Sequence, residues 1–527
     1  MLYATLVLLN GKVYTFNHKK PTAQAVAIFE EKIVYVGENS EASKLVGPQT
    51  KAIDLDGKTV LPGFTDCHVH MAGFGRSLSA LNLRNVTSIT QLKELIREKS
   101  QQLLPGTWIV SGGWDQEKFG EKRLPTRWDL DEAAPNNPVV LFRVCTHICV
   151  ANTKALEKAE IGRDTVAPPG GEIDRDPPTG ELTGIIREKA LDLIFKAFPK
   201  ASEEENFQVC LMACRKAVEA GLTGVHWIIE SPAEMRVIQK MCREGKLPLR
   251  VYLLVPAEFL ENLEGLGLMQ GFGDSMVKIG GLKILLDGSL GAQTAALYEP
   301  YNDAPETSGM LTYGQEDFEM LIFNAHKAGL QLAVHAIGDK AMDIALKAFE
   351  KALQKIPNAD HRHRIEHASV LNKELIRRMK SLGVIASVQP HFIVSDFWVK
   401  DRLGKKRTRW VYPFKSLMKA GVVVCGGSDC PVEPISPLFG IWAAVVKHPN
   451  SKECLTVEEA IRLYTVNAAY ANFEENLKGT IEEGKLADMI VLSDDPFKIK
   501  PGKIRDIKVS MTIVDGQMSA RRFIAKT

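Results

Sequence analysis

Two histidines, His68 and His70, stand one residue apart just after an apolar segment, Leu61–Phe64, that has the composition of a strand. Side chains alternate between the two faces of an extended strand, so positions i and i+2 point the same way. Neutral imidazole is a good ligand for borderline metals such as zinc. The spacing therefore predicts that both histidines can hold one metal ion, although a His-x-His pair alone is weak evidence.

Further residues that can bind a metal or move a proton lie at the ends of later apolar segments. They are Lys283, His335, His367 and Asp429. A single histidine at the end of one strand is usually a hydrogen-bonded core residue. Metal-competent residues at the ends of four strands, with a lysine inside an otherwise apolar strand, instead predict one shared site.

The elements that must position these residues are strands alternating with amphipathic helices, a pattern typical of a parallel sheet. The predicted strands are Val60–Asp66, Thr223–Trp227, Leu249–Val255, Gly281–Asp287, Leu330–His335, His363–His367, Val384–Gln389 and Val422–Asp429. Helical patterns lie between most of them, for example over residues 203–220 and 341–351. We therefore predict an α/β fold, a (β/α)8 TIM-like barrel whose strand ends meet at one mouth.

Both ends of the chain consist of short strands and turn signals. Those before residue 60 are too few to be stable alone, and matching segments recur at Leu486–Leu492 and Ile507–Val514. We expect residues 1–60 and 480–527 to form one composite β-sandwich domain, and residues 61–479 to form the catalytic barrel.

An insertion separates the first two barrel strands, because they lie much further apart than the ~30 residues of a βαβ unit. Residues 75–190 contain strand patterns at Trp108–Trp114 and Pro138–Val144 and a loop rich in proline and glycine. We predict an α+β insertion that follows the first barrel strand and caps the active site.

At this point the chain resembles a known family. The segments that carry the resemblance are, in order, LPGFTDCHVH, GLKILLDGSLGAQTAAL, LAVHAIGDKAMD, HRIEHASVL and GGSDCPVEPISPL. They are similar to the amidohydrolase superfamily, and most similar to amidohydrolase family 3, the branch that contains the N-substituted formamide deformylases. The resemblance extends over nearly the whole chain.

The resemblance implies a ligand set. His68 and His70 would bind the more buried metal ion, and His335 and His367 the more exposed one. Asp429 would contact the buried metal and the attacking water.

Lys283 matches the lysine that related enzymes carboxylate with carbon dioxide to bridge two metal ions. A carbamate offers two anionic oxygens, whereas an ammonium group would be repelled by two cations. The alternative is that Lys283 stays an amine beside a single metal ion. We expect one or two divalent ions per chain, with zinc as the expected metal.

The implied activity is hydrolysis of a carbon–nitrogen bond other than a peptide bond, in an amide, formamide or cyclic amide. A metal-activated hydroxide would attack, and Asp429 would act as general base and pass the proton to the leaving nitrogen. Asp429 as a ligand only is the alternative. A deaminase, or an ester or lactone hydrolase, remains an alternative on the same scaffold, and a non-catalytic regulatory or binding protein remains one of another class.

Three residues are weaker candidates for substrate contact. His391 follows the seventh predicted strand, and His147 and Trp114 lie in the insertion. Each has an ordinary alternative, support of the ligands or packing. His361 and His363 precede the sixth strand end, and we expect them to be solvated.

Composition narrows the choice of partner. The 527 residues contain 66 Lys and Arg against 64 Asp and Glu, and no run of like charges suggests nucleic acid or a membrane surface. Nine cysteines without a spacing framework favour a reducing cytoplasm. We expect a cytoplasmic enzyme with a small-molecule substrate and, from what is common among such folds, a homodimer.

Overall fold

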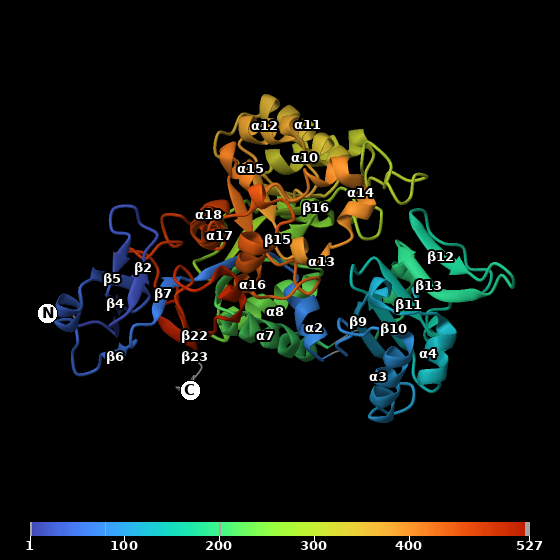
Figure 1. Ribbon diagram of the computed structural model, residues 1–527, viewed down its shortest axis with the longest axis horizontal. Helices are drawn as coiled ribbons and strands as arrows, with labels where there is room; N and C mark the ends of the chain where they lie inside the picture. The colour runs from blue at the N-terminus through green and yellow to red at the C-terminus, as the bar shows by residue number, and fades with distance from the viewer. Residues whose placement is uncertain (1–2, 80, 200–201, 522–527) are drawn as a thin grey trace. The chain divides into compact units, whose positions relative to one another are not determined.

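The computed structural model describes residues 3–79, 81–199 and 202–521 (Figure 1). It divides into two compact units. One comprises the chain before Gly73 together with the chain after Asn206, and the other is Gly73–Asn206.

The first unit contains an eight-stranded parallel sheet that is nearly closed into a barrel, as predicted. Its strands, in spatial order, are β8 (Phe64–Val69), β14 (Leu222–Ile228), β15 (Arg250–Pro256), β16 (Val277–Leu285), β17 (Gln331–Ala336), β18 (Arg364–His367), β19 (Ile385–Val388) and β20 (Val424–Gly426). The chain after β20 returns to β8, where Asp429 N donates to His68 O at 2.7 Å and His70 N donates to Cys430 O at 2.9 Å.

Helices cover the outside of this barrel, so most of its strands are buried on both faces. The crossover helices include α7 (Glu203–Glu219), α8 (Pro232–Arg243), α10 (Gln315–Lys327), α11 (Asp339–Lys355) and α12 (Lys373–Leu382), of which the last three pack side by side (Figure 1). In α11 the buried positions Ala341, Ala345, Ala348 and Ala352 recur at helical spacing.

The first predicted barrel strand was wrong at its start. The chain breaks at Gly63, so that β7 (Thr59–Pro62) joins a terminal sheet and only β8 belongs to the barrel. A Cβ at Gly63 would lie 2.2 Å from Thr223 Oγ1, which shows how closely the backbone passes β14 there. The consequence is that His68 lies inside the barrel strand and His70 directly follows it.

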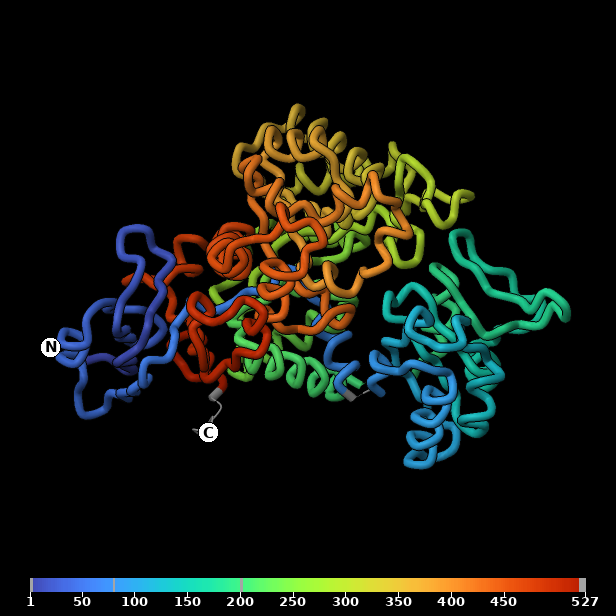
Figure 2. The backbone as a smooth tube through the Cα atoms, viewed as in Figure 1, coloured from blue at the N-terminus to red at the C-terminus, as the bar shows by residue number. Residues whose placement is uncertain are grey.

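The two chain ends form two further sheets. One has the order β5 (Lys32–Gly37), β4 (Ala25–Phe29), β1 (Leu6–Leu9), β6 (Lys51–Asp54). The other has the order β23 (Gln517–Arg521), β22 (Val509–Val514), β21 (Met489–Leu492), β7, β2 (Lys12–Tyr14), β3 (Thr22–Ala23). Strands β21 and β7 pair antiparallel, which brings the last part of the chain beside the first (Figure 2). One apolar core contains Leu6 and Ile28 from the first sheet and Met489 and Ile513 from the second, so both chain ends contribute to it as expected.

The second unit is built on a five-stranded sheet. Its order is β12 (Gly171–Arg175), β13 (Leu182–Glu188), β11 (Ile148–Ala151), β10 (Val139–Arg143), β9 (Ile109–Trp114). Helices α3 (Ile89–Gln101) and α4 (Arg127–Ala133) contribute to one of its apolar cores, and α5 (Thr153–Lys158) and α6 (Leu191–Ala197) contribute to another. This is the α+β insertion; that it caps the active site stays a prediction.

Within the described residues, no helix is both long enough and apolar enough to cross a bilayer. All nine cysteines are among the described residues, and none of them forms a disulfide.

Candidate metal centre

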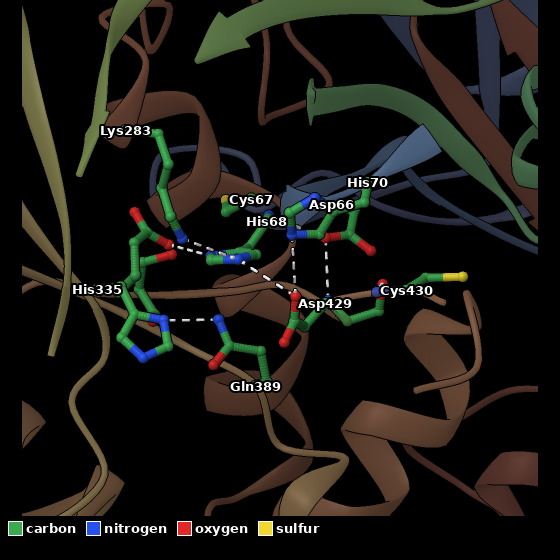
Figure 3. Close-up of polar contacts among 12 residues, drawn as sticks. Asp66, Cys67, His68, His70, Lys283, His335, Gln389, Asp429 and Cys430 are labelled. Atoms are coloured by element: carbon green, nitrogen blue, oxygen red, sulfur yellow. Dashed lines mark hydrogen bonds and ion pairs between the residues drawn. The ribbon is translucent and has the colours of Figure 1, made fainter. Parts of the chain in front are cut away.

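Three of the predicted ligands converge where β8 meets the chain after β20. The Nε2 atoms of His68 and His70 lie 3.3 and 3.4 Å from the same oxygen, Asp429 Oδ1 (Figure 3). One ligand atom from each of the three residues lies within 4.8 Å of the others. The donor set of two imidazoles and a carboxylate is one that zinc and similar divalent ions accept.

The ring of His68 is held in one orientation by a buried carboxylate. His68 Nδ1 lies 2.5 Å from Glu366 Oε2, and both side chains are fully buried. An ionised carboxylate only accepts, so Nδ1 donates to Glu366, and Nε2, which faces Asp429 and Lys283, is the nitrogen left to bind a metal ion. This is the tautomer that a metal ligand needs.

Glu366 is kept ionised by a second buried charge. Burial opposes the negative charge, but Arg364 and His68 hold the pKa of Glu366 well below its usual value. Arg364 Nε donates to Glu366 Oε1, while its other nitrogens contact His226 Nδ1 and Cys67 O, each at 2.6 Å. His226 therefore helps to hold the Arg364 side chain in place against Glu366.

Lys283 reaches the same place from β16. It is 3% exposed, and its Nζ lies 3.3 Å from His68 Nε2. Burial lowers the pKa of Lys283 to about 8, although Glu366 and Asp429 work in the opposite direction. A larger fraction of this amine is consequently neutral near pH 7 than for an exposed lysine.

His335 and His367 lie against each other beside His68. Their ring centroids are 4.3 Å apart, and the rings of His367 and His68 are 4.8 Å apart. Burial and the neighbouring His335 hold the pKa of His367 well below its usual value, so the ring is neutral. His335 Nε2 lies 3.0 Å from Gly288 O and 3.4 Å from Asp287 Oδ1.

The loop behind His335 is fixed by Asp287. Its Oδ2 accepts from Ala296 N at 2.9 Å and Gly338 N at 2.8 Å, and its Oδ1 accepts from Ile337 N at 3.0 Å. These hydrogen bonds tie the ends of β16 and β17 together, which positions the mouth on that side.

The backbone is strained at two of the predicted ligands. His367 has φ 73° and Asp429 has φ 59°, in the left-handed region. This conformation costs about 1–2 kcal/mol for a residue with a Cβ. Such outliers cluster at functional sites, where the surrounding structure compensates for them.

His70 is the most exposed of the three converging ligands. Burial disfavours its charge, but hydrogen bonds to Asp429 and Glu230 outweigh this and raise the pKa of His70 to about 9. Glu230 Oε1 lies 3.5 Å from His70 Nδ1. A metal ion can bind this ring only as the Nε2 proton leaves.

The residues present fit a divalent metal ion. His68 turns its Nε2 towards Asp429, and Asp429 is anionic because charge and hydrogen bonds from His68 and His70 hold its pKa well below the usual value against the effect of burial. His367 Nδ1 is buried and has no hydrogen-bond partner among the described residues. A buried ring nitrogen without a partner is costly unless it binds something.

The three weaker candidates occupy different surroundings. His391 is fully buried, its Nε2 donates to Ser436 O at 3.0 Å, and burial lowers its pKa to about 4. Its ring stacks on Phe439 at 5.5 Å. Its contact with substrate stays a prediction.

The other two belong to the second unit. Trp114 is fully buried in an apolar core there, and its Nε1 donates to Leu141 O at 3.0 Å. His147 Nδ1 lies 2.9 Å from Glu188 Oε2. Roles for them in substrate binding stay predictions.

His361 and His363 are not solvated, contrary to our expectation. Their exposed fractions are 5% and 1%. His363 Nε2 donates to His326 Nδ1 at 2.9 Å, and His326 Nε2 donates to Ile356 O at 2.8 Å. His363 Nδ1 accepts from Leu332 N at 3.1 Å, so these rings form a satisfied neutral chain.

Sequence reasoning missed several site residues. Glu366, Arg364, Glu230 and Gln389 were not singled out, yet each lies in or beside the ligand set. One signal was available for two of them. Charged residues at alternate positions of a strand that must be buried between neighbours have to be paired.

A parallel barrel with histidines, an aspartate and a buried lysine at its carboxyl ends defines the class as a metal-dependent hydrolase. The amidohydrolase family profile matches residues 51–520, and the chain belongs to this family. The predicted resemblance is confirmed.

Individual relatives agree over nearly the full length. The putative amidohydrolase YtcJ of Bacillus subtilis (strain 168) is 37% identical over 525 residues, covering 96% of this chain and 98% of that protein. The N-substituted formamide deformylase of Arthrobacter pascens is 29% identical over 540 residues, covering 98% of each. The crystal structure of an uncharacterized metal-dependent hydrolase from Pyrococcus furiosus has a TM-score of 0.77 at 35% identity, covering 94% of this chain and 100% of that one.

Proposed function

We propose that this hydrolase cleaves a carbon–nitrogen bond other than a peptide bond, in an amide, formamide or cyclic amide. The observation that carries the proposal is the convergence of His68, His70 and Asp429 on one point at the barrel mouth. The full-length similarity to a deformylase of N-substituted formamides supports the choice of bond.

His68, His70 and Asp429 would hold one metal ion, and His335 and His367 would hold a second, with Lys283 between them. Such ions lower the pKa of bound water towards about 7 and polarise a substrate carbonyl. Zinc is the expected metal on the donor set.

Asp429 would act as the general base. Its low pKa keeps it ionised at neutral pH, and Oδ1 lies between the two histidine nitrogens. It would take a proton from the attacking water and pass it to the leaving nitrogen, since an amide anion leaves poorly.

Lys283 would be carboxylated. Its neutral amine adds to carbon dioxide and releases one proton, which gives a carbamate with two anionic oxygens. The lowered pKa of about 8 favours this reaction because only the unprotonated amine adds. The alternative is an unmodified amine beside one metal ion.

The experiment is a screen of metal-depleted protein reloaded with zinc. The panel contains N-alkylformamides, cyclic amides, an aminopyrimidine and a lactone. We expect turnover of an amide only with metal present, loss of turnover in His70→Ala, and no change in the exposed control His18→Ala. Turnover confined to the lactone or the aminopyrimidine would contradict the proposed bond.

The cytoplasmic location, the small-molecule substrate and the homodimer stay predictions.

A further inference from the structure

Gln389 follows β19, and the nitrogen and oxygen of its side-chain amide differ in their hydrogen bonding. The residue is 2% exposed, and its Nε2 donates to Ser387 O at 3.3 Å. Its Oε1 is buried and accepts no hydrogen bond from the described residues. Exchanging the two amide atoms would place Oε1 against the Ser387 carbonyl oxygen, so the orientation follows from chemistry.

The side chain of Gln389 points into the candidate metal centre. Figure 3 shows its amide group between the side chains of His335 and Asp429. An acceptor left unsatisfied in a buried place is destabilising. If the side chain served packing alone, an apolar residue would fill the same place without the cost of an unsatisfied acceptor.

We propose that Gln389 Oε1 accepts a hydrogen bond from the N–H of the scissile group, and so selects N-monosubstituted and cyclic amides over esters and N,N-disubstituted amides. An amide nitrogen bearing hydrogen is a donor, whereas an ester oxygen and a fully substituted nitrogen are not. A site with an unpaired polar group rejects a ligand that lacks the matching partner. This inference rests on the proposed function and names its substrate class.

The test compares two chelators that differ in one N–H. Acetohydroxamic acid and N-methylacetohydroxamic acid both bind a metal ion through two oxygens, but only the first has an amide N–H. Their affinities for the zinc-loaded protein are measured by calorimetry, with metal content and thermal unfolding as checks. The variants are Gln389→Met, which keeps the size of the side chain, and Gln239→Met, a control on the exposed face of α8.

We expect the wild type and Gln239→Met to prefer acetohydroxamic acid by about tenfold. In Gln389→Met this preference should shrink by several-fold with metal content unchanged. The N-methyl group of the second chelator affects the wild type and Gln389→Met alike. The difference between the affinity ratios of the two proteins therefore reports the hydrogen bond to the N–H.

Two results would overturn the inference in distinguishable ways. An unchanged preference in Gln389→Met would mean that Oε1 serves something other than the substrate N–H, such as the attacking water, and would leave the proposed function intact. Failure of both hydroxamates to bind the zinc-loaded wild type would overturn the proposed metal chemistry, and the inference with it.

Discussion

Replacing Glu366 by glutamine is the most informative change to the ligand set, because it alters one charge and almost no volume. Glu366 accepts from His68 Nδ1 at 2.5 Å and from Arg364 Nε, and all three side chains are buried. A glutamine amide has one acceptor and one donor end. If the oxygen faces Arg364, the NH2 group faces His68 Nδ1 and moves the ring proton to Nε2, which blocks coordination.

Two magnitudes follow. Loss of a carboxylate that orients a ligating histidine lowers metal affinity by about 10–100-fold. Removing one partner of a buried ion pair costs about 3–5 kcal/mol of unfolding free energy, because the Arg364 charge is left uncompensated. Metal affinity is measured by competition with a chromogenic chelator, and unfolding by urea titration of the metal-free protein.

Two controls separate the effects. The exposed pair Glu374 and Arg377 has the same chemistry at 60% and 69% exposure, so Glu374→Gln should leave the unfolding free energy nearly unchanged. Adding Arg364→Met to Glu366→Gln should recover much of the stability but none of the metal affinity. Wild-type metal affinity in Glu366→Gln would refute the reasoning about the His68 tautomer.

Three further predictions concern catalysis, the pH dependence of stability, and the ion pair between Arg250 of the barrel strand β15 and Asp488, which precedes β21. Asp429→Asn should lower turnover by at least about 100-fold while at least one metal ion is retained, and full activity would rule out the role of base. Burial and the neighbouring His361 hold the pKa of His363 well below 6.5, so only the unfolded chain gains its proton as the pH falls below that value. This contribution to stability is therefore fully present above pH 6.5 and is lost as the pH falls below that value. His363→Gln should lower the slope of unfolding free energy against pH, measured by urea titration at several pH values, by about 1.4 kcal/mol per pH unit. An unchanged slope would contradict this. Arg250 makes bonds of 2.7 and 3.0 Å to Asp488, so Arg250→Met should lower the unfolding free energy by about 3–5 kcal/mol, and Asp488→Asn in the same chain should restore part of it.

The barrel was predictable because its signals are local. Strands such as β17 and β19 are apolar runs between turn signals, and α11 carries its buried residues at helical spacing. The residues predicted as ligands lie near one another because a parallel barrel brings its carboxyl strand ends together whatever the loops do. The break at Gly63 has a local signal in the turn dipeptide Pro62-Gly63, but Val60 and Phe64 look equally strand-like, so the stretch was predicted as one strand.

The missed residues share a different cause. Arg364 and Glu366 belong to a charged stretch, HRHRIEH, that resembles a solvated surface when it is viewed alone. Only the fold shows that each charge meets a partner from another strand, as Glu366 meets His68. Pairing between distant segments is what single-sequence patterns do not encode, and the same reason explains why His363 was expected in solvent.

The central claim is that this chain binds divalent metal through the histidines and aspartate at the barrel mouth. The most direct test is the number of metal ions per chain by elemental analysis of protein purified with bicarbonate, together with intact mass in native and acidic conditions. The account predicts two divalent ions per chain, loss of the mass of one carbon dioxide on acidification, and loss of metal in His68→Ala. A His68→Ala protein that retains the full metal content of the wild type would contradict it.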